Sequence, residues 1–528
     1  MLPPGYSVLR PVRVTKSFAI AILFAALLPG DASPDRAADR IGVRYAGPTR
    51  LAGTPSLRAV ASGPARIVAV TFTLRGRPLA SDTTAPFAVD VETRALRAGR
   101  ATLRTIAVDA AGRRASVATA VTVIPSRRSV HRVRSQAELP SALAALARGH
   151  VTVVLSRGTF FAERIRLASG ARFIGSGSGT VIRAPADSSY WGIIVAEGRG
   201  IRISDLTVDG GGPGAGIGHA VVVQSGSHDV RLSRVRIRDV RKVGVFAWGA
   251  YSSVSVQDSQ ITGGPGASAG VVAGESGTFG TSSDSSVIRT RLANFEDFGI
   301  LFAHQAHGRT DAARNALALD NDVRNVADPD RAGCVTVPTA AGCGTNEGGI
   351  WSGSYGGAII GNRITNTRWD GIETVGSSTG ATVVGNRVSA TRTGIYLEHA
   401  TNHSLIARNA ISDVESGILV EWTYGGVSSQ FNNFRQNRIS RARRVGLLVS
   451  IGADGNRIES NTFADSALPA IVLHGSSQNV VRRNRACGVR GRVVAEWVGR
   501  HDTGSTATPA GNTIADNAAT PRCRTSGR

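Results

Sequence analysis

The stretch GIETVGSSTGATVVGNRVSATRTGIYLEHATNHSLIARN, residues 371–409, contains two copies of one pattern. Each copy begins with a glycine and an isoleucine, at Gly371 and again 23 residues later at Gly394. An asparagine follows 15 residues after each glycine, at Asn386 and Asn409. A unit of this length cannot bury its own apolar face, but stacked copies can, so the pattern predicts a repeat architecture.

The unit recurs in both directions along the chain. A small residue followed by an apolar strand begins at Gly192, Ala220, Gly244, Gly270, Gly299, Gly349, Gly371, Gly394, Gly417, Gly446 and Ala470. An asparagine series occupies Asn321, Asn362, Asn386, Asn409, Asn437, Asn461, Asn484 and Asn512. Asparagine tolerates the left-handed turn conformation, and stacked copies can hydrogen-bond to one another. Short strands, no helical period between them and an asparagine ladder predict the coils of a parallel β-solenoid.

The segment ahead of the repeats also resembles the start of a known fold. Ser135-Gln136-Ala137-Glu138 is typical of a helix start and predicts a capping helix over 136–148. VTVVLSRGTF at 151–160 and IGSGSGTVI at 174–182 follow it. These features resemble the right-handed parallel β-helix (pectin-lyase-like) superfamily. The resemblance implies an all-β fold of about 11–13 coils over residues 128–524.

A separate domain is expected over residues 42–126. Alternating apolar residues such as Val68, Val70 and Phe72, with the turn signal Gly76-Arg77-Pro78, predict a small antiparallel β-sandwich. Through DTTAPF at 82–87 and AVDAAG at 107–112 it resembles bacterial immunoglobulin-like modules. Such modules are spacers or adhesive units, so the resemblance implies no chemistry.

The first 32 residues have the pattern of a signal peptide. Arg10, Arg13 and Lys16 precede an apolar run over 18–28, which is too short to span a bilayer comfortably, and small residues follow at 30–32. We expect cleavage there, with an uncleaved anchor as the alternative. No later stretch is apolar enough to cross a membrane, so the mature protein is expected to be secreted, to the cell surface or beyond.

The four cysteines fit an oxidising compartment. Proximity favours pairing Cys334 with Cys343 and Cys487 with Cys523, among three pairings that four cysteines allow. The first bridge would pin a long loop over 326–348. No CxxC spacing occurs, so a cysteine zinc site is not expected.

Strand alternation places a set of acids on one outer face. If the residue after each glycine points inward, the second and fourth residues point to solvent. The second positions of successive coils are Trp351, Glu373, Tyr396, Leu419, Leu448 and Val472, and the fourth positions are Gly353, Val375, Glu398, Glu421, Ser450 and His474. Glu398 and Glu421 should therefore lie on neighbouring coils, with Glu373 beside them and Asp370 at the strand entrance.

Clustered carboxyl groups suit acid–base chemistry. When two carboxyl groups lie close together, their like charges raise the pKa of one of them. A general acid beside a carboxylate needs such a raised pKa, so the first hypothesis is a hydrolase that uses Glu398 and Glu421. In a lyase the same acids would hold calcium, and Tyr396 or Arg392 would take the proton. His399, beside Glu398, could relay protons. The alternative is a solvated acidic strip without chemistry. No other metal site is expected.

The partner is expected to be an extracellular polysaccharide. Trp351, Trp369 and Trp422 lie on or next to the strands and could serve as platforms for sugar rings. The net charge of +23 leaves room for a polyanionic glycan, although all but two cations are arginines, as coding bias would produce. Nucleic acid is not expected, because the arginines look scattered through turns such as Asn-Arg rather than gathered in one stripe.

The activity stays open between several classes. The β-helix superfamily includes lyases, hydrolases, epimerases and noncatalytic spikes, and the motif sets NTD, DD, GHG and RIK of polygalacturonases and DPHE of mannuronan epimerases are not found here. We therefore expect either a polysaccharide hydrolase or lyase, or a noncatalytic glycan-binding or adhesion solenoid. The oligomeric state is not predicted.

Overall fold

The fold was obtained as a computed structural model of the 528-residue chain. It describes residues 41–528 apart from 53–54, 86, 92, 94–95, 125–129, 187, 189–190, 212–217, 250–251, 275–283, 303–313, 327–347, 376–377, 399, 422–428, 468, 489–491, 501–505, 521–522 and 524–528. The expected signal peptide, His399, Trp422 and the Cys334–Cys343 bridge lie outside the described residues. Among those that are described, no helix is both long and apolar enough to cross a bilayer.

The N-terminal strands form two sheets around a common core. The five-stranded sheet has the order β2-β8-β7-β4-β5 and the three-stranded sheet the order β1-β3-β6. Their bounds are β1 Gly42–Tyr45, β2 Arg50–Ala52, β3 Ser56–Ser62, β4 Ile67–Leu74, β5 Arg77–Asp82, β6 Ala88–Asp90, β7 Gly99–Asp109 and β8 Arg114–Ile124. Leu57, Phe72 and Leu103 are fully buried between the sheets. The pairs are antiparallel apart from β2 with β8. The immunoglobulin-like resemblance of this sandwich stays a prediction.

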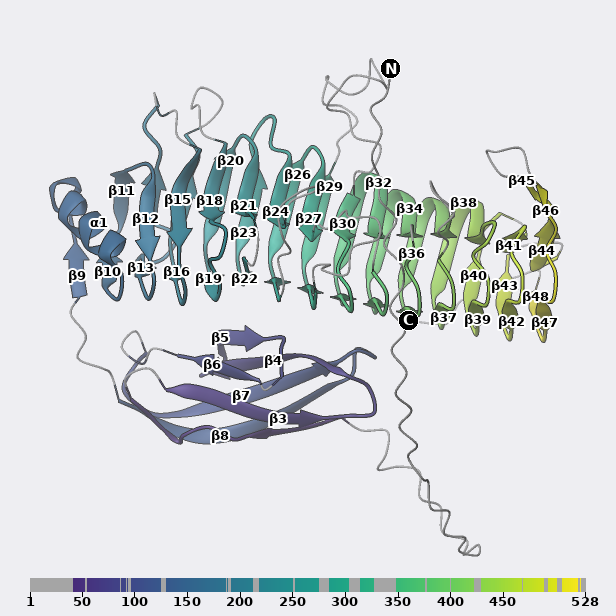
Figure 1. The fold of residues 1–528 in the computed structure, drawn as a ribbon, viewed down its shortest axis with the longest axis horizontal. Helices are drawn as coiled ribbons and strands as arrows, with labels where there is room; N and C mark the ends of the chain where they lie inside the picture. The colour runs from purple at the N-terminus through teal and green to yellow at the C-terminus, as the bar shows by residue number, and fades with distance from the viewer. Residues whose placement is uncertain are drawn as a thin grey trace, which may run out of the picture. The chain divides into compact units, whose positions relative to one another are not determined.

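The rest of the chain is a parallel β-helix, as predicted, and Figure 1 shows its coils stacked side by side from α1 to β48. One sheet of 15 strands forms the first wall. Its strands are β9 Val130–Val133, β10 Thr152–Leu155, β13 Arg172–Ile174, β16 Arg202–Ser204, β19 Val230–Ser233, β22 Val254–Gln257, β25 Ser286–Ile288, β28 Leu317–Leu319, β31 Ala358–Ile360, β33 Thr382–Val384, β35 Leu405–Ala407, β37 Asn433–Arg435, β39 Arg457–Glu459, β42 Val480–Arg482 and β47 Thr513–Ala515.

A second sheet of 23 strands bends into two further walls. The second wall contains β11 Gly158–Phe161, β14 Thr180–Arg183, β17 Thr207–Asp209, β20 Arg236–Val240, β23 Gln260–Gly263, β26 Arg291–Phe295, β29 Asp322–Val326, β40 Thr462–Ala464, β43 Arg485–Cys487 and β48 Ala518–Thr520. The third wall contains β12 Ile165–Ala168, β15 Gly192–Glu197, β18 His219–Val223, β21 Val243–Ala247, β24 Ala269–Ala273, β27 Phe298–Phe302, β30 Gly348–Ser352, β41 Ile471–His474 and β44 Val494–Trp497. Four long strands begin in the second wall and end in the third: β32 Arg363–Thr374, β34 Arg387–Leu397, β36 Ala410–Val420 and β38 Arg438–Val449.

Both ends of the solenoid have small additional features. At the start, the predicted helix is present as the 3₁₀ turn η1 Gln136–Glu138 followed by α1 Leu139–Arg148. Ser135 makes no capping hydrogen bond, but the Glu138 carboxylate accepts one from the Arg134 backbone N–H at 2.6 Å. At the end, β45 Gly499–Arg500 pairs with β46 Thr506–Ala507. The predicted Cys487–Cys523 disulfide is formed there.

Asparagine side chains hold successive coils together from inside. Asn362 Nδ2 donates to Asn386 Oδ1 at 3.0 Å, and Asn386 Nδ2 donates to Asn409 Oδ1 at 3.0 Å. The full ladder runs Asn321, Asn362, Asn386, Asn409, Asn437, Asn461, Asn484 and Asn517. The sequence interpretation was wrong for Asn512, which belongs to a second ladder with Asn432, Asn456 and Asn479.

The left-handed turn expected at the ladder asparagines lies one residue earlier. Arg408, Gln436 and Arg483 have φ of 56°, 57° and 56°, whereas the asparagines that follow them do not have positive φ. The asparagine therefore recurs at the same place in each coil because of the hydrogen bonds that it makes. A left-handed backbone conformation is not the reason. Its oxygen also accepts a hydrogen bond from the backbone N–H of the asparagine on the preceding coil, as Asn386 Oδ1 does from Asn362 at 2.9 Å.

Candidate functional site

The register of the third wall stacks the residues expected at the second position of each repeat. Trp351 pairs with Glu373, Glu373 with Tyr396 and Tyr396 with Leu419. The fourth positions follow the same order, because the backbone N–H of Glu398 donates to Thr374 and that of Glu421 to Leu397. Adjacent coils are about 4.8 Å apart. Residues 23 apart in sequence therefore lie side by side, as predicted.

The repeated glycine sets this register. A Cβ at Gly394 would overlap the Ile411 side chain and the carbonyl oxygen of Gly417 on the next coil. No other residue leaves room for that approach, because every other side chain begins with a Cβ. The residue after the glycine, such as Ile372 or Ile395, is fully buried in the solenoid core. Its neighbour, Glu373 or Tyr396, therefore points to the outer face of the wall.

The acids on this face are much less exposed than the alternation predicts. We define the acid cluster as Asp370, Glu373, Glu398 and Glu421. Glu373 is 0% exposed, Glu398 5% and Asp370 9%, whereas Glu421 is half-buried. The expectation that the second and fourth positions face solvent is thus wrong for Glu373 and Glu398. Glu373 and Glu398 lie on the outer side of the third wall, but that side is not open to solvent where they lie.

Burial gives the acid cluster unusual protonation behaviour. The pKa of Glu373 is well above its usual range, chiefly because of burial and secondly because of the charges of Asp370 and Glu398. Burial likewise raises the pKa of Asp370 to about 7, against the opposing effects of Thr393 and Arg392. Neither oxygen of Glu373 accepts a hydrogen bond of normal geometry from a described residue. Burial therefore favours the protonated form of this carboxyl group.

Glu421 is the member of the acid cluster that remains accessible. Burial raises its pKa, while a hydrogen bond from Tyr396 acts in the opposite direction. The Tyr396 hydroxyl donates to Glu421 Oε2 at 3.0 Å. Burial and the negative charge of Glu421 raise the pKa of Tyr396 far above its usual range. Tyr396 is therefore a hydrogen-bond donor here, and the role of base predicted for it is disfavoured.

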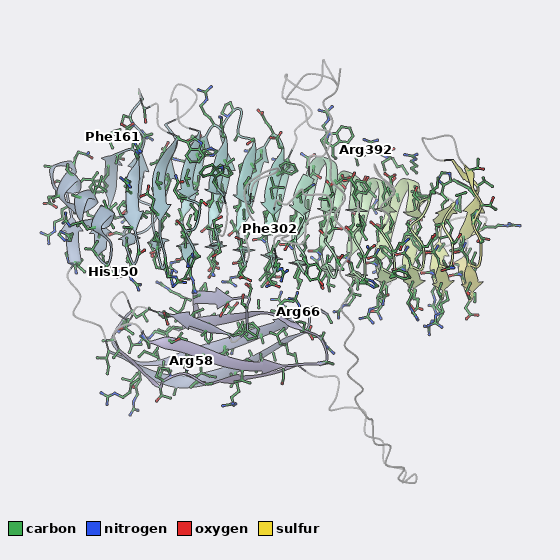
Figure 2. All side chains as sticks on the ribbon, viewed as in Figure 1. Arg58, Arg66, His150, Phe161, Phe302 and Arg392 are labelled. Atoms are coloured by element: carbon green, nitrogen blue, oxygen red, sulfur yellow. A yellow bond between two sulfur atoms is a disulfide. The ribbon has the colours of Figure 1, made fainter. Side chains whose placement is uncertain are left out.

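Arg392 lies at the exposed edge of this site (Figure 2). Its guanidinium carbon is 4.5 Å from the centroid of the Trp369 ring, and its Nε is 3.7 Å from a Glu415 oxygen. Arg444 approaches the same carboxylate at 3.9 Å. A guanidinium that stacks on an aromatic face and approaches a carboxylate suits charge compensation beside the acids more than the predicted role of a base.

Trp351 is not the exposed sugar platform that the sequence suggested, whereas that role stays a prediction for Trp369 and for Trp422, which lies outside the described residues. Trp351 is only 4% exposed, and it packs with Val375 and beside Phe298, at 6.5 Å between ring centroids. Trp369 is half-buried beneath Arg392. Both are structural parts of the wall around the acids.

An aromatic cluster on the same wall was missed. Trp191, 42% exposed, contacts Phe246 and Trp248 edge to face at centroid distances of 5.8 and 5.6 Å. His219 stacks on Phe246 at 4.7 Å, and burial lowers the pKa of His219 to about 4, aided by Lys242. Part of the signal was present, since Phe246 occupies the second, outward position of the repeat that begins at Gly244, whereas His219 and Trp191 come just before the repeats that begin at Ala220 and Gly192. Their side chains are too dissimilar to show as a sequence motif.

The predicted calcium site is not supported by a suitable group of ligands. Within the described ranges, no three His, Cys, Asp or Glu side chains are arranged to hold a metal ion. Calcium at the acid cluster stays a prediction, and His304 and His307 lie outside those ranges.

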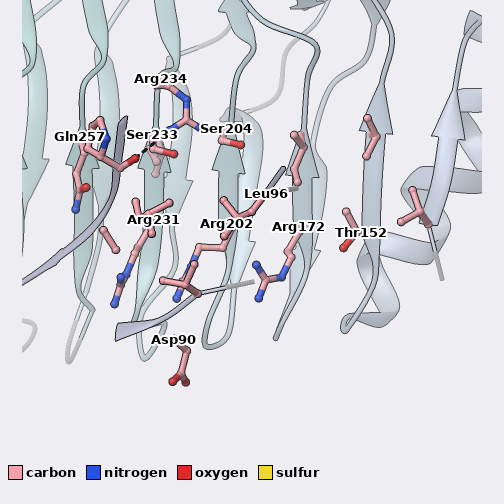
Figure 3. Close-up of a pocket in the computed structure, with 18 of the residues that line it drawn as sticks. Asp90, Leu96, Thr152, Arg172, Arg202, Ser204, Arg231, Ser233, Arg234 and Gln257 are labelled. Atoms are coloured by element: carbon pink, nitrogen blue, oxygen red, sulfur yellow. Dashed lines mark hydrogen bonds between the residues drawn. The ribbon is translucent and has the colours of Figure 1, made fainter. Parts of the chain in front are cut away.

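A cavity of about 330 Å³ lies on a different wall from the acids. Its solenoid lining includes Arg172, Arg202 and Arg231, which stack in one row of β13, β16 and β19 (Figure 3). Burial and the neighbouring charge of Arg231 lower the pKa of Arg202 to about 10. Asp229 bridges Arg202 and Arg231 at 2.9 Å from each. The cavity is therefore cationic and is not part of the acid site.

Comparisons with known proteins give one match to a family model and several distant structural similarities. Residues 329–519, about a third of the chain, match the family model "Periplasmic copper-binding protein (NosD)". A comparison with curated proteins finds no match. Among solved structures, the surface adhesin PfbA of Streptococcus pneumoniae is 11% identical with a TM-score of 0.42, over 71% of this chain and 90% of that one.

Two enzymes show likeness at the same level. DFA-IIIase from Arthrobacter chlorophenolicus A6 is 13% identical with a TM-score of 0.41, covering 76% of this chain and 99% of that one. The A-module of Azotobacter vinelandii mannuronan C-5 epimerase AlgE6 is 14% identical with a TM-score of 0.39, covering 72% and 95%. Identities this low transfer no activity to the present chain.

Proposed function

We propose that this chain is an exported β-helix protein that hydrolyses a neutral polysaccharide at the acid cluster. The observation that carries the proposal is the accessible Glu421, a carboxyl group with a raised pKa, one coil away from Glu398. A carboxylic acid that keeps its proton beside a second carboxyl group is the pairing that glycoside hydrolysis requires. The Cys487–Cys523 disulfide supports a location outside the cytoplasm.

The coil spacing favours a retaining reaction. Carboxyl groups on adjacent coils, about 4.8 Å apart, approach the separation of about 5–5.5 Å at which the second carboxylate acts as nucleophile. Glu421 would protonate the glycosidic oxygen while Glu398 attacks the anomeric carbon, which requires the surface that buries Glu398 to open when the glycan binds. Water would then release the sugar, with the Glu421 carboxylate taking its proton. Tyr396 would orient Glu421 through their hydrogen bond.

Elimination fits this site less well. A lyase must accept a uronate carboxylate, which would add a negative charge next to four acids, of which Asp370, Glu373 and Glu421 already have raised pKa values. The two bases predicted for it, Tyr396 and Arg392, serve instead as a hydrogen-bond donor and a stacked cation. A neutral glycan meets neither obstacle.

A noncatalytic glycan binder is the second candidate. The exposed Trp191 and its partners Phe246 and Trp248 offer aromatic surface on the same wall, which suits sugar binding without chemistry. In that case the acids would shape the wall and no bond would be cleaved.

The decisive assay compares neutral and uronic polysaccharides by their products. New reducing ends without absorbance from unsaturated sugars are expected with a neutral glycan. Glu421→Gln should lower turnover by a factor of about 10²–10⁴, because the general acid is lost. Glu398→Gln should lower it similarly. The control is Glu197→Gln on β15 of the same wall, a half-buried acid that pairs with Arg166.

The outcomes separate the candidates. Full turnover by Glu421→Gln would show that the acid cluster is not the catalytic centre. Binding of a glycan without either product, weakened by Trp191→Ala, would establish the noncatalytic function instead.

A further inference from the structure

One register row of the second wall carries a line of arginines. Its consecutive members are Arg236, Gln260, Arg291, Asp322, Arg363, Arg387, Ala410, Arg438, Thr462 and Arg485. We define the arginine stripe as its six cations: Arg236, Arg291, Arg363, Arg387, Arg438 and Arg485. The sequence interpretation of scattered arginines is therefore wrong. The residue after an asparagine of the first ladder has the same place in every coil, so Asn-Arg pairs in that ladder put Arg363, Arg387, Arg438 and Arg485 on this row.

The arginine stripe is exposed and lacks counter-charges. All six residues are exposed, and none of their side chains forms an ion pair or hydrogen bond with another described residue. Arginines elsewhere on the solenoid are paired, as Arg234 is with Asp205 and Arg441 with Asp413. The one acid in the row, Asp322, is paired with Arg324. The six charges of the stripe are thus available to a ligand.

The surface beside the stripe carries short and mostly polar side chains. Two residues further along each strand, the outward positions are mostly small: Thr262, Ala293, Thr365, Ser389, Ser412, Ser440 and Ala464. Two hollows of about 370 and 400 Å³ flank Arg291. A chain lying along the stripe would meet little steric obstruction and could accept or donate hydrogen bonds at the hydroxyl groups.

The length of the stripe selects an extended ligand. From Arg236 to Arg485 the row crosses ten strands, so at about 4.8 Å per coil it extends over roughly 40 Å. A small anion would use one or two arginines. A linear polymer with repeated negative groups could use all six at once, and multiple weak contacts of this kind add up.

We propose that the arginine stripe binds a linear acidic polysaccharide, with guanidinium groups paired to its carboxylates or sulfates. Guanidinium matches both groups by two parallel hydrogen bonds. The net charge of +23 would steer such a polyanion to the protein. Single-stranded nucleic acid is the less suitable polyanion, because neither this row nor the row of small residues contains an aromatic side chain on which bases could stack.

The stripe lies on the second wall and the acid cluster on the third, so this inference does not depend on the proposed hydrolysis. It assigns the solenoid two surfaces of opposite character. An acidic matrix glycan would hold the protein in place while a neutral glycan occupies the other wall.

The test measures affinity of the full chain for polygalacturonate, dextran sulfate, neutral dextran and single-stranded DNA. Binding of the acidic polysaccharides is expected at 50 mM salt and should fall by about a hundredfold or more at 200 mM, as expected for about six charge contacts. Neutral dextran should not bind to the stripe.

The key variant is Arg363→Gln with Arg387→Gln and Arg438→Gln. It should lose at least about tenfold in affinity at 50 mM salt, since half of the stripe is removed. The matched control removes the same charge from the sandwich by Arg44→Gln, Arg58→Gln and Arg104→Gln, three exposed arginines. It should stay within about twofold of the original chain if only general charge attraction is lost.

Each other outcome overturns the proposal. Equal losses in the two triple variants would mean that only net charge matters. Tighter binding of single-stranded DNA than of either acidic glycan would identify a nucleic-acid surface. Thermal melting checks that both variants fold, and Glu421→Gln should bind acidic glycan like the original chain, which separates this result from a failure of the proposed hydrolysis.

Discussion

At the scale of single residues, Glu373 is the most informative side chain of the molecule. It lies on an outward position but is fully buried, and no described residue gives it a hydrogen bond of normal geometry. An ionised carboxylate in such surroundings is costly, so the group keeps its proton. Alternation alone could place Glu373 next to Tyr396, but could not reveal that this part of the wall is covered.

This protonation predicts a dependence of stability on pH. Because the folded pKa of Glu373 is raised, its stabilising contribution is complete below the unfolded pKa and is lost as pH rises toward the folded value. Glu373→Gln should therefore flatten the fall of the melting temperature between pH 5 and 8.

The control for that measurement is Asp413→Asn. The pKa of Asp413 is lowered by Arg441, so its contribution is lost only as pH falls below its ordinary range. This variant should keep the slope of the original chain between pH 5 and 8. Equal slopes for the original chain and Glu373→Gln would contradict a buried, protonated Glu373.

Tyr396 allows a second prediction at this scale. Its hydrogen bond lowers the pKa of Glu421, so Tyr396→Phe should raise that pKa. If Glu421 is the general acid, turnover of a neutral glycan by the variant should persist to higher pH. The pH–rate profile checks this, and an alkaline limb that moves to lower pH would exclude Glu421 as the proton donor.

At the scale of elements, the asparagine ladder links successive coils. Its hydrogen bonds add to those that the three-residue strands of the first wall make between coils. Asn386 Nδ2 donates to the Ile359 carbonyl and to Asn409, while its oxygen accepts from Asn362. The spacing of the asparagines revealed this ladder, because a hydrogen-bonded column requires the same residue in each coil. Asn512 was misassigned because the last coil carries two asparagines, Asn512 and Asn517, and spacing alone does not separate them.

Asn386→Ala should destabilise the solenoid by at least about 2 kcal/mol, because it removes the side chain that bonds the buried Ile359 carbonyl and Asn362 N–H of the preceding coil. Chemical denaturation measures this loss. Ser389→Ala, three residues away on the adjacent strand, is the control and should cost less than about 0.5 kcal/mol. A loss of similar size in both variants would show that the ladder adds nothing specific.

At the scale of the whole molecule, periodicity predicted the coils and the rows, and proximity in the sequence predicted the C-terminal disulfide. It failed where a property depends on what covers a wall or on which side chains share a row. Trp351 was expected to be an exposed platform and is buried, whereas the stacked cations of Arg363 and Arg387 were read as separate turn residues. Both errors arise because exposure and charge density are properties of neighbouring coils together.

The two-residue alternation of each strand also restricts how this protein can change its length. Removing one residue ahead of Glu373 within β32 would turn Ile372 outward and a carboxyl group into the apolar interior. Extra residues at the corners between walls would leave that alternation intact. In descendants of this gene, we expect insertions and deletions to accumulate in the turns between walls and to be rare within the strands.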